Sequence, residues 1–449
     1  MAAFPLPSWL AFLQGPSAQA PWCRTALATE ASLQGAVDAV AKQLQGSGPA
    51  DLALVFASAS YASDLQRLLP LLQSQLKSKH WLGCVGGGVV GTDTAGKPHE
   101  LEHAPALSVT LLRLPGAELR PFAIDTAELP DLDGPAEPWQ DLLQAPGDEL
   151  ATMPSMLLLI DPSCPAINDL ISGLDYACPQ AAKLGGIAGQ HSASHGSLLF
   201  SHGSDPQGGV TTGGVRSGGV RSGGVKTGAV GCLIGGSWRL DPLVAQGCRP
   251  IGPVLEVEQA QRNVVLEVSE GSKRHSPVAA LQSILTSLSA DERELAKNSL
   301  FLGVGRSSFN LAASQTGTSS AFLVRNLIGI DPRNGAVAVA ERMRAGQQVQ
   351  FQLRDGTTSR QELRQLLERQ RLQQPAPLAA LVFACLGRGQ GLYGERDGDV
   401  SACREAFAEV PIAGAFCNGE IGPVAGSTHL HGYTASWAFL VPHGSDHPA

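Results

Sequence analysis

Polar side chains that can ionise or form strong hydrogen bonds follow two apolar runs near the end of the chain. The first run, Leu378 to Cys385, precedes the glycine-rich turn Gly387-Arg388-Gly389. The second run, Ile412 to Phe416, precedes Cys417 and then Asn418-Gly419-Glu420. Each run has the length of a buried strand. Loops at strand ends are where a rigid sheet usually presents binding residues, so the two turns predict a ligand site between them.

The predicted site is made of residues that can donate, accept or make room for a ligand. These residues are Cys385, Gly387, Arg388, Gly389, Asn418, Gly419, Glu420, His431, Tyr433, Arg325 and Arg354. Arg388 would offer forked donors to an acidic ligand group. Glu420 would accept from an amine or a hydroxyl, and the glycines would let a ligand approach the backbone. We expect neither a metal nor a cofactor there.

Three arginines of this set lie at or near the ends of predicted strands: Arg325, Arg354 and Arg388. A buried arginine must be paired, and a ligand carboxylate is one natural partner. A structural bridge is the alternative, with Asp331, Asp355 and Glu420 as the available carboxylates. The sequence leaves both interpretations open.

Two cysteines are candidate nucleophiles. Cys385 precedes turn amides and a guanidinium, which can stabilise a thiolate, and Cys417 has a weaker case of the same kind. Glu420 or His431 would then serve as the base. The alternative is that both thiols are packed and inert, and no nucleophile, base and orienting group can be assembled from the spacing.

Other motifs in the chain do not indicate a cofactor or metal site. GxGxxG occurs twice, from Gly86 and from Gly389, but no predicted helix opens directly from the last glycine. A dinucleotide needs that helix to hold its pyrophosphate. His191, His195 and His202 lie in a Ser/Gly-rich stretch without paired cysteines, so we interpret it as a solvated loop.

Composition favours a soluble globular protein of two or three domains. The chain has 449 residues, of which 43% are hydrophobic and 16% charged. A net charge of −8 does not favour nucleic-acid binding. Nine scattered cysteines without a CxxC pair indicate a reducing compartment. No apolar run reaches membrane-spanning length and no secretory signal is evident, so we expect a cytoplasmic location.

The elements that must position the site follow an order that occurs three times. A strand, a helix, a second strand with a glycine turn and a further strand begin at Leu52, at Met156 and at Leu378. Asp399 is the predicted N-cap of the third helix. Alternating strands and helices predict an α/β fold: mixed β-sheets covered by helices in two lobes. The segment between Cys248 and Arg354 predicts an antiparallel sheet with one helix.

Several motifs in order closely resemble the FIST domain family. They are GCVGGGVVG from Gly83, CRPIGP from Cys248, FLVRNLIGIDP from Phe322, LVFACLGRG from Leu381, FCNGEIGPV from Phe416 and LHGYTAS from Leu430. The resemblance implies a FIST N-terminal domain over residues 26–246 and a FIST C-terminal domain over residues 247–442. An N-terminal arm (1–25) and a tail (443–449) would flank them. The LHGYT pattern selects His431 over His429.

The FIST resemblance also implies a function. The family consists of intracellular modules proposed to sense small ligands, so we expect a non-enzymatic sensory module that signals through a separate partner. An amino acid or a derivative would suit a site with both Arg and Glu. A thiol enzyme and a protein-interaction scaffold are the alternatives. Some family members carry an F-box, for which too few residues precede the resemblance here.

Two stretches are predicted to be surface segments. Residues 128–147 are rich in proline and acidic residues. Residues 208–227 form a five-residue repeat, GGVTT-GGVRS-GGVRS-GGVKT. A basic glycine-rich tract could bind an anion or a nucleic acid, but the absence of interleaved aromatic residues favours a flexible hairpin loop.

Deleting Gly208 to Thr227 and joining Gln207 to Gly228 is expected to change the free energy of unfolding by less than about 1 kcal/mol. The repeat resists ordering because of its glycines, and valine is its one apolar residue type. Denaturant titration of the deletion variant and the full chain measures the difference. A large loss of stability, or of soluble expression, would show that the repeat is structural.

Overall fold

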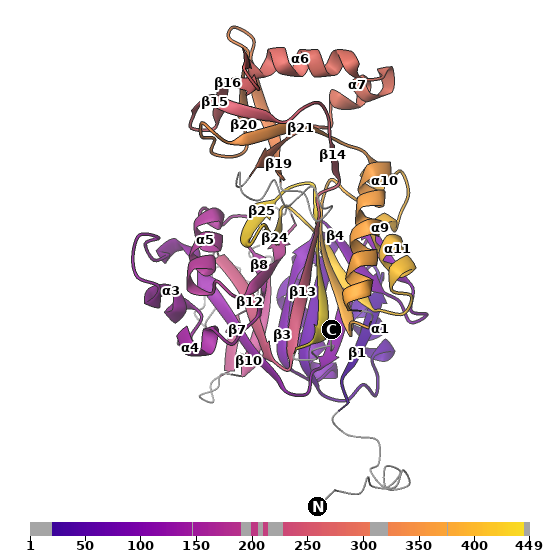
Figure 1. Cartoon of the computed structure of the whole chain (residues 1–449). Coiled ribbons are helices and arrows are strands. Elements are labelled where there is room, and N and C mark those ends of the chain that lie inside the picture. The colour runs from indigo at the N-terminus through magenta and orange to yellow at the C-terminus, as the bar shows by residue number, and fades with distance from the viewer. Residues whose placement is uncertain are drawn as a thin grey trace, which may run out of the picture.

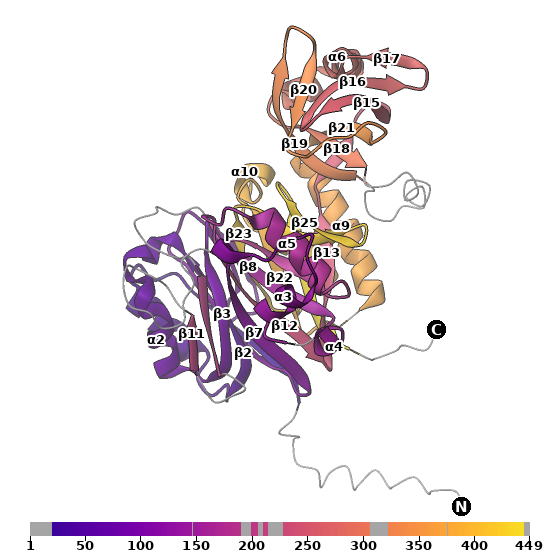
Figure 2. The ribbon, with the colours of Figure 1, turned by 90° about the vertical axis from the view of Figure 1, so that its left-hand side faces the viewer.

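The computed structural model describes residues 20–145, 147–189, 199–204, 210–213, 228–305, 322–374 and 376–443. They form two lobes, a large core and a smaller barrel at one end of it (Figures 1 and 2). The core consists of three six-stranded mixed sheets covered by helices, so the predicted α/β class is confirmed. The barrel is inserted between the strand that ends at Ala245 and the helix that begins at Gly356.

Three units with one strand order build the core. The first comprises β1 (Trp22–Ala28), α1 (Leu33–Gln43), β2 (Ala50–Ser58), α2 (Leu65–Gln75), β3 (Ser78–Gly86) and β6 (Leu107–Arg113). The second comprises β7 (Ala117–Asp125), α3 (Glu137–Leu142), α4 (Gly147–Leu150), β8 (Ser155–Ile160), α5 (Ile167–Ala177), β9 (Ala182–Ile187) and β12 (Gly228–Gly236). The third comprises β13 (Trp238–Ala245), α9 (Gly356–Gln373), β22 (Ala379–Cys385), α10 (Gln390–Tyr393), α11 (Gly398–Ala406), β23 (Ile412–Cys417) and β26 (Ala435–Pro442).

The pairing inside each unit is the same. The two strands joined by the crossover helix, β2 and β3, β8 and β9, or β22 and β23, are parallel. The last strand of the unit returns antiparallel beside the first of these, and the opening strand pairs with that return strand. The repeated strand–helix–strand–strand order that the sequence predicts is therefore confirmed as a repeat of connectivity.

Each unit contributes a hairpin to the sheet of another unit. The hairpins are β4 (Gly88–Thr92) with β5 (Pro98–Glu102), β10 (Leu199–Ser204) with β11 (Val210–Gly213), and β24 (Glu420–Val424) with β25 (Ser427–His431). The first pairs with β23 of the third unit, the second with β3 of the first unit, and the third with β9 of the second unit. The exchange closes a cycle, so no sheet of the core is complete within one unit.

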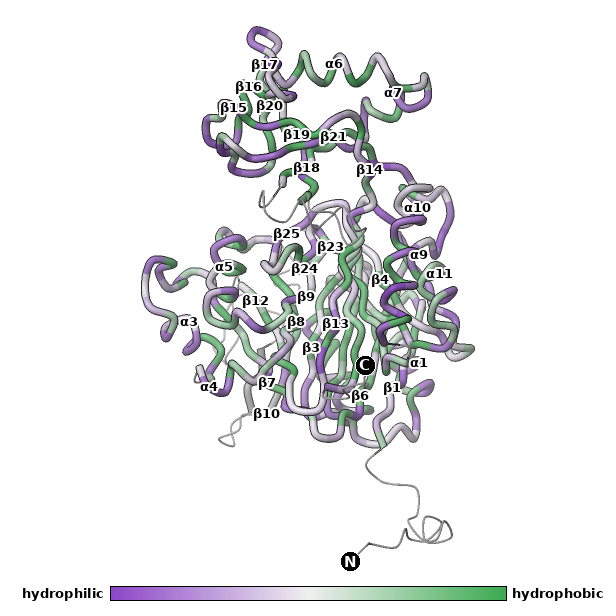
Figure 3. Tube along the Cα trace, in the orientation of Figure 1, coloured by the Kyte–Doolittle hydropathy of each residue, from purple (hydrophilic) through white to green (hydrophobic). Residues whose placement is uncertain are grey.

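Alternate residues of the central strands separate an inner and an outer apolar face. In β22, Leu381 and Phe383 belong to the core shared by the three sheets, whereas Ala380 and Val382 pack beneath α9 and α11. Phe56 of β2 meets Phe383 edge to face, with ring centroids 6.0 Å apart. Figure 3 shows these strands as mostly hydrophobic and the outer side of α9 as hydrophilic.

Glycine marks one equivalent position in all three units. Gly83, Gly185 and Gly414 lie in the second parallel strand, opposite Val55, Leu158 and Val382. A Cβ atom at each of the three would lie 1.8 Å from the carbonyl oxygen of its partner. In the unit that begins at Met156, the predicted glycine turn after the second strand is not formed by Gly185 and Gly186, because both lie inside β9, and Gly185 permits the close approach.

The barrel is antiparallel and closes through the pairing of β18 with β21. Its elements are β14 (Cys248–Pro250), β15 (Leu255–Gln261), β16 (Val264–Glu270), β17 (Lys273–His275), α6 (Pro277–Ser287), α7 (Ala290–Ala296), β18 (Leu300–Gly305), β19 (Phe322–Asp331), β20 (Ala336–Val339) and β21 (Gln348–Arg354). It encloses its own apolar core, which includes Val257, Leu302 and Phe351. The predicted antiparallel sheet is therefore part of a closed barrel.

Four local predictions need correction or lie wholly or partly outside the described residues. Residues 128–147 are not only a surface loop, because α3 buries Trp139 completely against Gly173 of α5. Asp399 does not cap α11 but lies in its first turn. Of the repeat at 208–227, only Val210–Gly213 is described, as a strand paired with β10. His191 and His195 lie outside the described residues.

Gly414→Ala is expected to destabilise the protein by about 2–3 kcal/mol or to prevent folding, because the added methyl group overlaps a backbone carbonyl that cannot move freely. Gly391→Ala is the control, since a Cβ there has no neighbour within 4 Å. It should leave stability unchanged or slightly raised. Denaturant titration of both variants measures the difference, and equal stabilities would contradict the close approach.

Candidate functional site

The carboxyl end of β22 lies beside the barrel, because Gly387, which follows this strand, accepts a hydrogen bond from Arg354 of β21. Equivalent residues lie at the carboxyl end of the first parallel strand in the three units: Ser58 ends β2, Cys385 ends β22, and Asp161 directly follows β8. The backbone N–H of each donates to a carbonyl next to or at the start of the return strand, at 2.9, 2.8 and 2.9 Å respectively. The backbone is thus repeated three times, whereas the side chains differ.

Only some of these side chains are satisfied locally. Ser58 Oγ accepts the Ala106 N–H at 3.0 Å, and Asp161 Oδ1 accepts the Ser163 N–H at 2.9 Å. Around Cys385 the arrangement differs, because three buried side chains nearby each keep an atom without a hydrogen-bond partner. These atoms are Oε1 of Glu420, Nε of Arg354 and Nη1 of Arg388. A buried polar atom left in this way normally costs stability unless something else satisfies it.

Glu420 begins β24 and is completely buried. Its Oε2 accepts the hydroxyl of Thr434 at 2.8 Å and the backbone N–H of the same residue at 3.1 Å. Burial raises the pKa of Glu420 to about 8, against the opposing effect of the Thr434 hydrogen bonds. A carboxyl group with this pKa is largely protonated at neutral pH, so Glu420 can donate as well as accept.

Arg354 ends β21 of the barrel and reaches the core. Only 7% of the residue is exposed, and its Nη2 donates to the Gly387 carbonyl at 2.9 Å. Its guanidinium lies over the Tyr433 ring, 4.9 Å from the centroid. No carboxylate among the described residues forms an ion pair with it. Burial and then the nearby Arg388 lower its pKa, as expected for a cation without a counter-charge.

The charges of Glu420 and Arg354 both act on the Cys385 thiol. Its Sγ accepts the Gly387 N–H at 3.5 Å, and the residue is half-buried. Burial and then the Glu420 carboxyl raise the pKa of the thiol to about 11. Burial also raises the pKa of Cys417, which is inaccessible to solvent, well above its usual value. Both thiols are therefore protonated at neutral pH, which is opposite to the activation that a thiol nucleophile needs.

Arg388 and Arg325 are occupied by structural pairs. Arg388 is completely buried and donates twice to Asp399, with both N···O distances 2.7 Å. Although burial opposes its charge, Asp399 helps to raise the pKa of Arg388 well above its usual value. Arg325 pairs with Glu341 at 2.8 Å. The bridging carboxylates differ from those considered from the sequence, because the actual partners come from α11 and the loop after β20.

Glu100, a buried acid of the first unit, caps the start of α11. The Asp399 side chain is therefore not needed as a cap and can pair with Arg388. Glu100 of β5 accepts the backbone N–H groups of Asp399 and Val400 at 3.0 and 2.9 Å, and so caps α11 from outside. Burial and then Asp399 raise the pKa of Glu100 to about 8. The sequence reasoning missed Glu100, and also Thr434. Thr434 follows the predicted Tyr433 directly, whereas nothing in the sequence connects Glu100 with α11.

The remaining predicted residues surround the same strand ends. His431 is buried opposite Glu420 in the β24–β25 pair, and its Nε2 lies 3.0 Å from the Gly422 carbonyl oxygen. Asn418 is exposed, and its backbone N–H donates to Ile187 of the second unit at 3.0 Å. Gly419 continues this contact, since its carbonyl accepts the Ile187 N–H at 2.8 Å. Gly389 packs against Glu102, with a φ of 61°.

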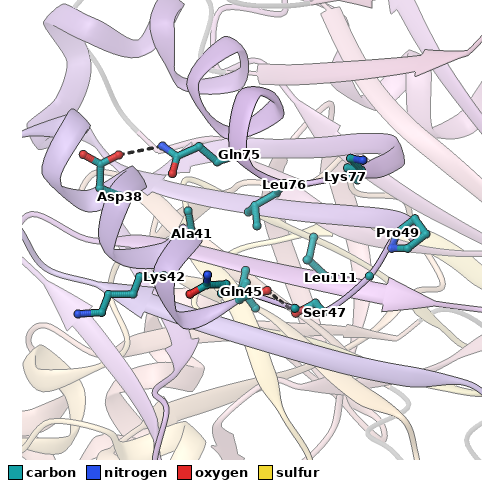
Figure 4. A pocket seen from close by; sticks show the side chains of 13 residues that line it. Asp38, Ala41, Lys42, Gln45, Ser47, Pro49, Gln75, Leu76, Lys77 and Leu111 are labelled. Atoms are coloured by element: carbon teal, nitrogen blue, oxygen red, sulfur yellow. Dashed lines mark hydrogen bonds between the residues drawn. The ribbon is translucent and has the colours of Figure 1, made fainter.

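A groove of about 620 Å³ lies at the opposite end of the first unit, near the amino ends of β2 and β3 (Figure 4). Its hydrogen bonds join neighbouring groups: Gln75 donates to Asp38 at 2.8 Å, and the Ser47 hydroxyl donates to Leu44 at 2.6 Å. None of the unpartnered buried atoms of the described residues belongs to its lining. We therefore place the candidate site at Arg354, Cys385, Glu420 and Tyr433.

Within the described ranges, no group of three or more His, Cys, Asp or Glu side chains could hold a metal ion. In the same part of the chain, no helix is long and apolar enough to cross a membrane.

Two family models match the chain. The FIST N domain matches residues 51–270 and the FIST C domain matches residues 278–423. The chain is 32% identical to "Uncharacterized protein Rv0628c" of Mycobacterium tuberculosis over 401 residues, or 89% of this chain and 93% of the relative. It is 31% identical to "Uncharacterized protein Mb0898c" of Mycobacterium bovis over 420 residues, or 93% and 97% of the two chains.

The titration of Glu420 is expected to lower the free energy of unfolding as the pH rises from about 5 to about 8. The Glu420 carboxyl titrates near 4.5 when unfolded and near 8 when folded, so the folded state holds the proton more tightly across this window. Its contribution is complete at low pH and is lost as the pH rises through about 8. Melting temperatures between pH 5 and pH 8 measure the effect.

The Glu420→Gln variant removes this titrating group, so its melting temperature should fall less over the same pH range. Glu100 titrates in the same window and will leave part of the slope in place. Glu395→Gln, on the surface, is the control and should keep the slope of the unmodified protein. Identical slopes for Glu420→Gln and the unmodified protein would contradict the raised pKa of Glu420.

Proposed function

Because this chain belongs to the FIST family, we propose that it is a non-enzymatic sensory module that binds a small carboxylate ligand beside Arg354. FIST domains are in general small-ligand sensory modules of signal transduction. An amino acid or a derivative is the ligand class that the site suits best. A separate signalling protein would then read the bound state.

The observation that supports this proposal most directly is the state of the Arg354 guanidinium. It is buried at the junction of the lobes, its Nε has no hydrogen-bond partner, and no described carboxylate balances its charge. Burying a cation in this way is costly, and evolution usually pairs it. A ligand carboxylate that accepts from Nε and from the second hydrogen of Nη2 would supply the missing partner with good geometry.

Glu420 would distinguish among carboxylate ligands. Its Oε1 is buried without a hydrogen-bond partner, and Glu420 raises the pKa of the Cys385 thiol whereas Arg354 lowers it. As a protonated acid, Glu420 would donate to a ligand carbonyl or hydroxyl. To hold the ammonium group of an amino acid, it would have to lose its proton, so amino-acid binding would release a proton at neutral pH.

A thiol enzyme is the less favoured function. Cys385 is the more exposed of the two candidate thiols, and its raised pKa leaves little thiolate at neutral pH. Arg388, which would have stabilised that thiolate, is committed to Asp399. These two facts favour binding over catalysis. A protein-interaction scaffold has no feature of the described residues that specifically supports it.

Binding of propionate, L-alanine and propylamine to the purified protein tests the proposal. The three probes carry a carboxylate, a carboxylate with an ammonium group, and an ammonium group alone. Propionate or L-alanine should raise the melting temperature, because a ligand that binds only the folded state stabilises it. Propylamine should not. A melting temperature unchanged by these probes and by larger carboxylic and amino acids would contradict the proposed site.

Arg354→Met should weaken binding of the effective probe by about 1.5–3 kcal/mol, the range for a lost charge-assisted hydrogen bond. Titration calorimetry measures the loss. Arg344→Met, at an exposed position of the barrel, is the matched control and should bind normally. The melting temperature without ligand shows whether each variant is folded. Undiminished binding by a folded Arg354→Met variant would place the ligand elsewhere.

A further inference from the structure

The barrel is joined to the core by two chain segments that lie side by side. One segment, Gln246-Gly247, leads from β13 to β14, and the other, at Asp355, leads from β21 to α9. Cys248 pairs with Arg354 across the two segments. Figures 1 and 2 show the barrel as a separate lobe beyond this junction. A double connection of this kind resembles a stalk, about which a lobe can turn without unfolding.

The base of this stalk is fixed to the core. Gly247 has a φ of 71°, and a Cβ atom there would lie 2.6 Å from the Ser359 hydroxyl and 3.0 Å from Arg388. The Ser359 hydroxyl donates to the Gly247 carbonyl at 2.8 Å, and Glu362 accepts the Gly247 N–H. The pivot is therefore set by α9, and any movement of the barrel takes place beyond Gly247.

Beyond the stalk, one aromatic side chain of the core contacts two side chains of the barrel. The Arg354 guanidinium lies 4.9 Å from the centroid of the Tyr433 ring, and the Phe301 ring meets Tyr433 edge to face with its centroid also 4.9 Å away. Arg354 donates in addition to the Gly387 carbonyl of the core. These four residues, Tyr433, Gly387, Arg354 and Phe301, form what we call the clasp.

The backbone of Tyr433 supports a role beyond packing. Its φ is 65°, in the left-handed region that a bulky side chain rarely adopts. Such a residue costs of order 1 kcal/mol and persists only where its surroundings hold it. Here the surroundings include the barrel, because Arg354 and Phe301 hold the ring. The position of the barrel and the conformation of Tyr433 are therefore linked.

We propose that ligand binding closes the barrel onto the core: the acidic group of the ligand binds Arg354 of the barrel while the rest of the ligand contacts the strand ends of the core. This inference rests on the function proposed above. The Nε of Arg354 is buried without a hydrogen-bond partner while Nη2 already donates to Gly387, so a ligand carboxylate that reached Nε would add a contact to the clasp. Ligand binding would thus fix the position of the barrel relative to the core, and a partner protein could recognise that position.

Tyr433 is a positioning residue in this device, and its variants test the device without any ligand. Hydrogen exchange of the full-length protein is followed at the core segment 385–388 and at the stalk segment 246–250. Tyr433→Ala should raise exchange in both segments several-fold, and small-angle scattering should show a larger radius of gyration. Tyr433→Phe keeps the ring and should match the unmodified protein. Tyr176→Ala, at an exposed tyrosine of α5, is the control.

Tyr433→Gly separates the clasp from ordinary packing. It removes the ring, so both segments should exchange as fast as they do in Tyr433→Ala. It also removes the strain, so its melting temperature should be the higher of the two. Exchange in Tyr433→Ala equal to that of the unmodified protein would overturn the clasp, whether or not a ligand is known.

The ligand arm uses propionate and L-alanine as probes. The probe that raises the melting temperature should slow exchange in both segments of the unmodified protein, and it should do so less in Tyr433→Ala. A probe that binds through Arg354 yet leaves exchange in both segments unchanged would overturn the proposed closure, while the proposed function would stand. If neither probe binds but Tyr433→Ala still raises exchange in both segments, the proposed ligand class is wrong and the clasp stands.

Discussion

The structure depends on a constraint at the centre of the core, where three strand ends must approach one another closely. The backbone N–H of Gly87 donates to Phe416, that of Gly189 to Val85, and that of Asn418 to Ile187, at 2.9, 2.8 and 3.0 Å. Each bond joins one unit to another, and together they form a ring. The hairpins that follow these residues can then cross into the neighbouring sheets. If the ring were absent, the three sheets would have no common register.

This ring also accounts for where chemistry can occur. Because the three units share one backbone, each offers the same kind of strand end, and side chains alone distinguish them. At the third end, the barrel is inserted into the unit and brings Arg354 to within hydrogen-bond distance of Gly387. A repeated core with the same strand order in each unit thus acquires one asymmetric cluster of polar groups, the candidate site, from an inserted lobe. Sites formed between two lobes are common because both can contribute groups to one ligand.

The sequence predicted the local and repeated features better than the long-range ones. Apolar runs such as Met156 to Ile160 predicted buried strands because burial on both faces leaves a continuous apolar pattern. The exchange of hairpins was not predictable. β4 pairs with β23 more than three hundred residues away, and the hydrophobic pattern of a strand does not indicate its distant partner. Trp139 was missed for a related reason: its proline-rich, acidic surroundings predict a loop, and only the space above Gly173 gives it a place.

For the candidate site, the sequence identified the residue types but not their partners. A buried arginine must have a counter-charge, so Arg325, Arg354 and Arg388 were equivalent candidates. Two of them prove to have acidic partners within the fold, Glu341 and Asp399, and the third has none among the described residues. A fold that depends on paired charges elsewhere has no structural need for an unbalanced guanidinium. The unbalanced guanidinium of Arg354 is therefore the basis of the ligand site proposed above, and its position between the lobes would let a bound ligand contact both of them.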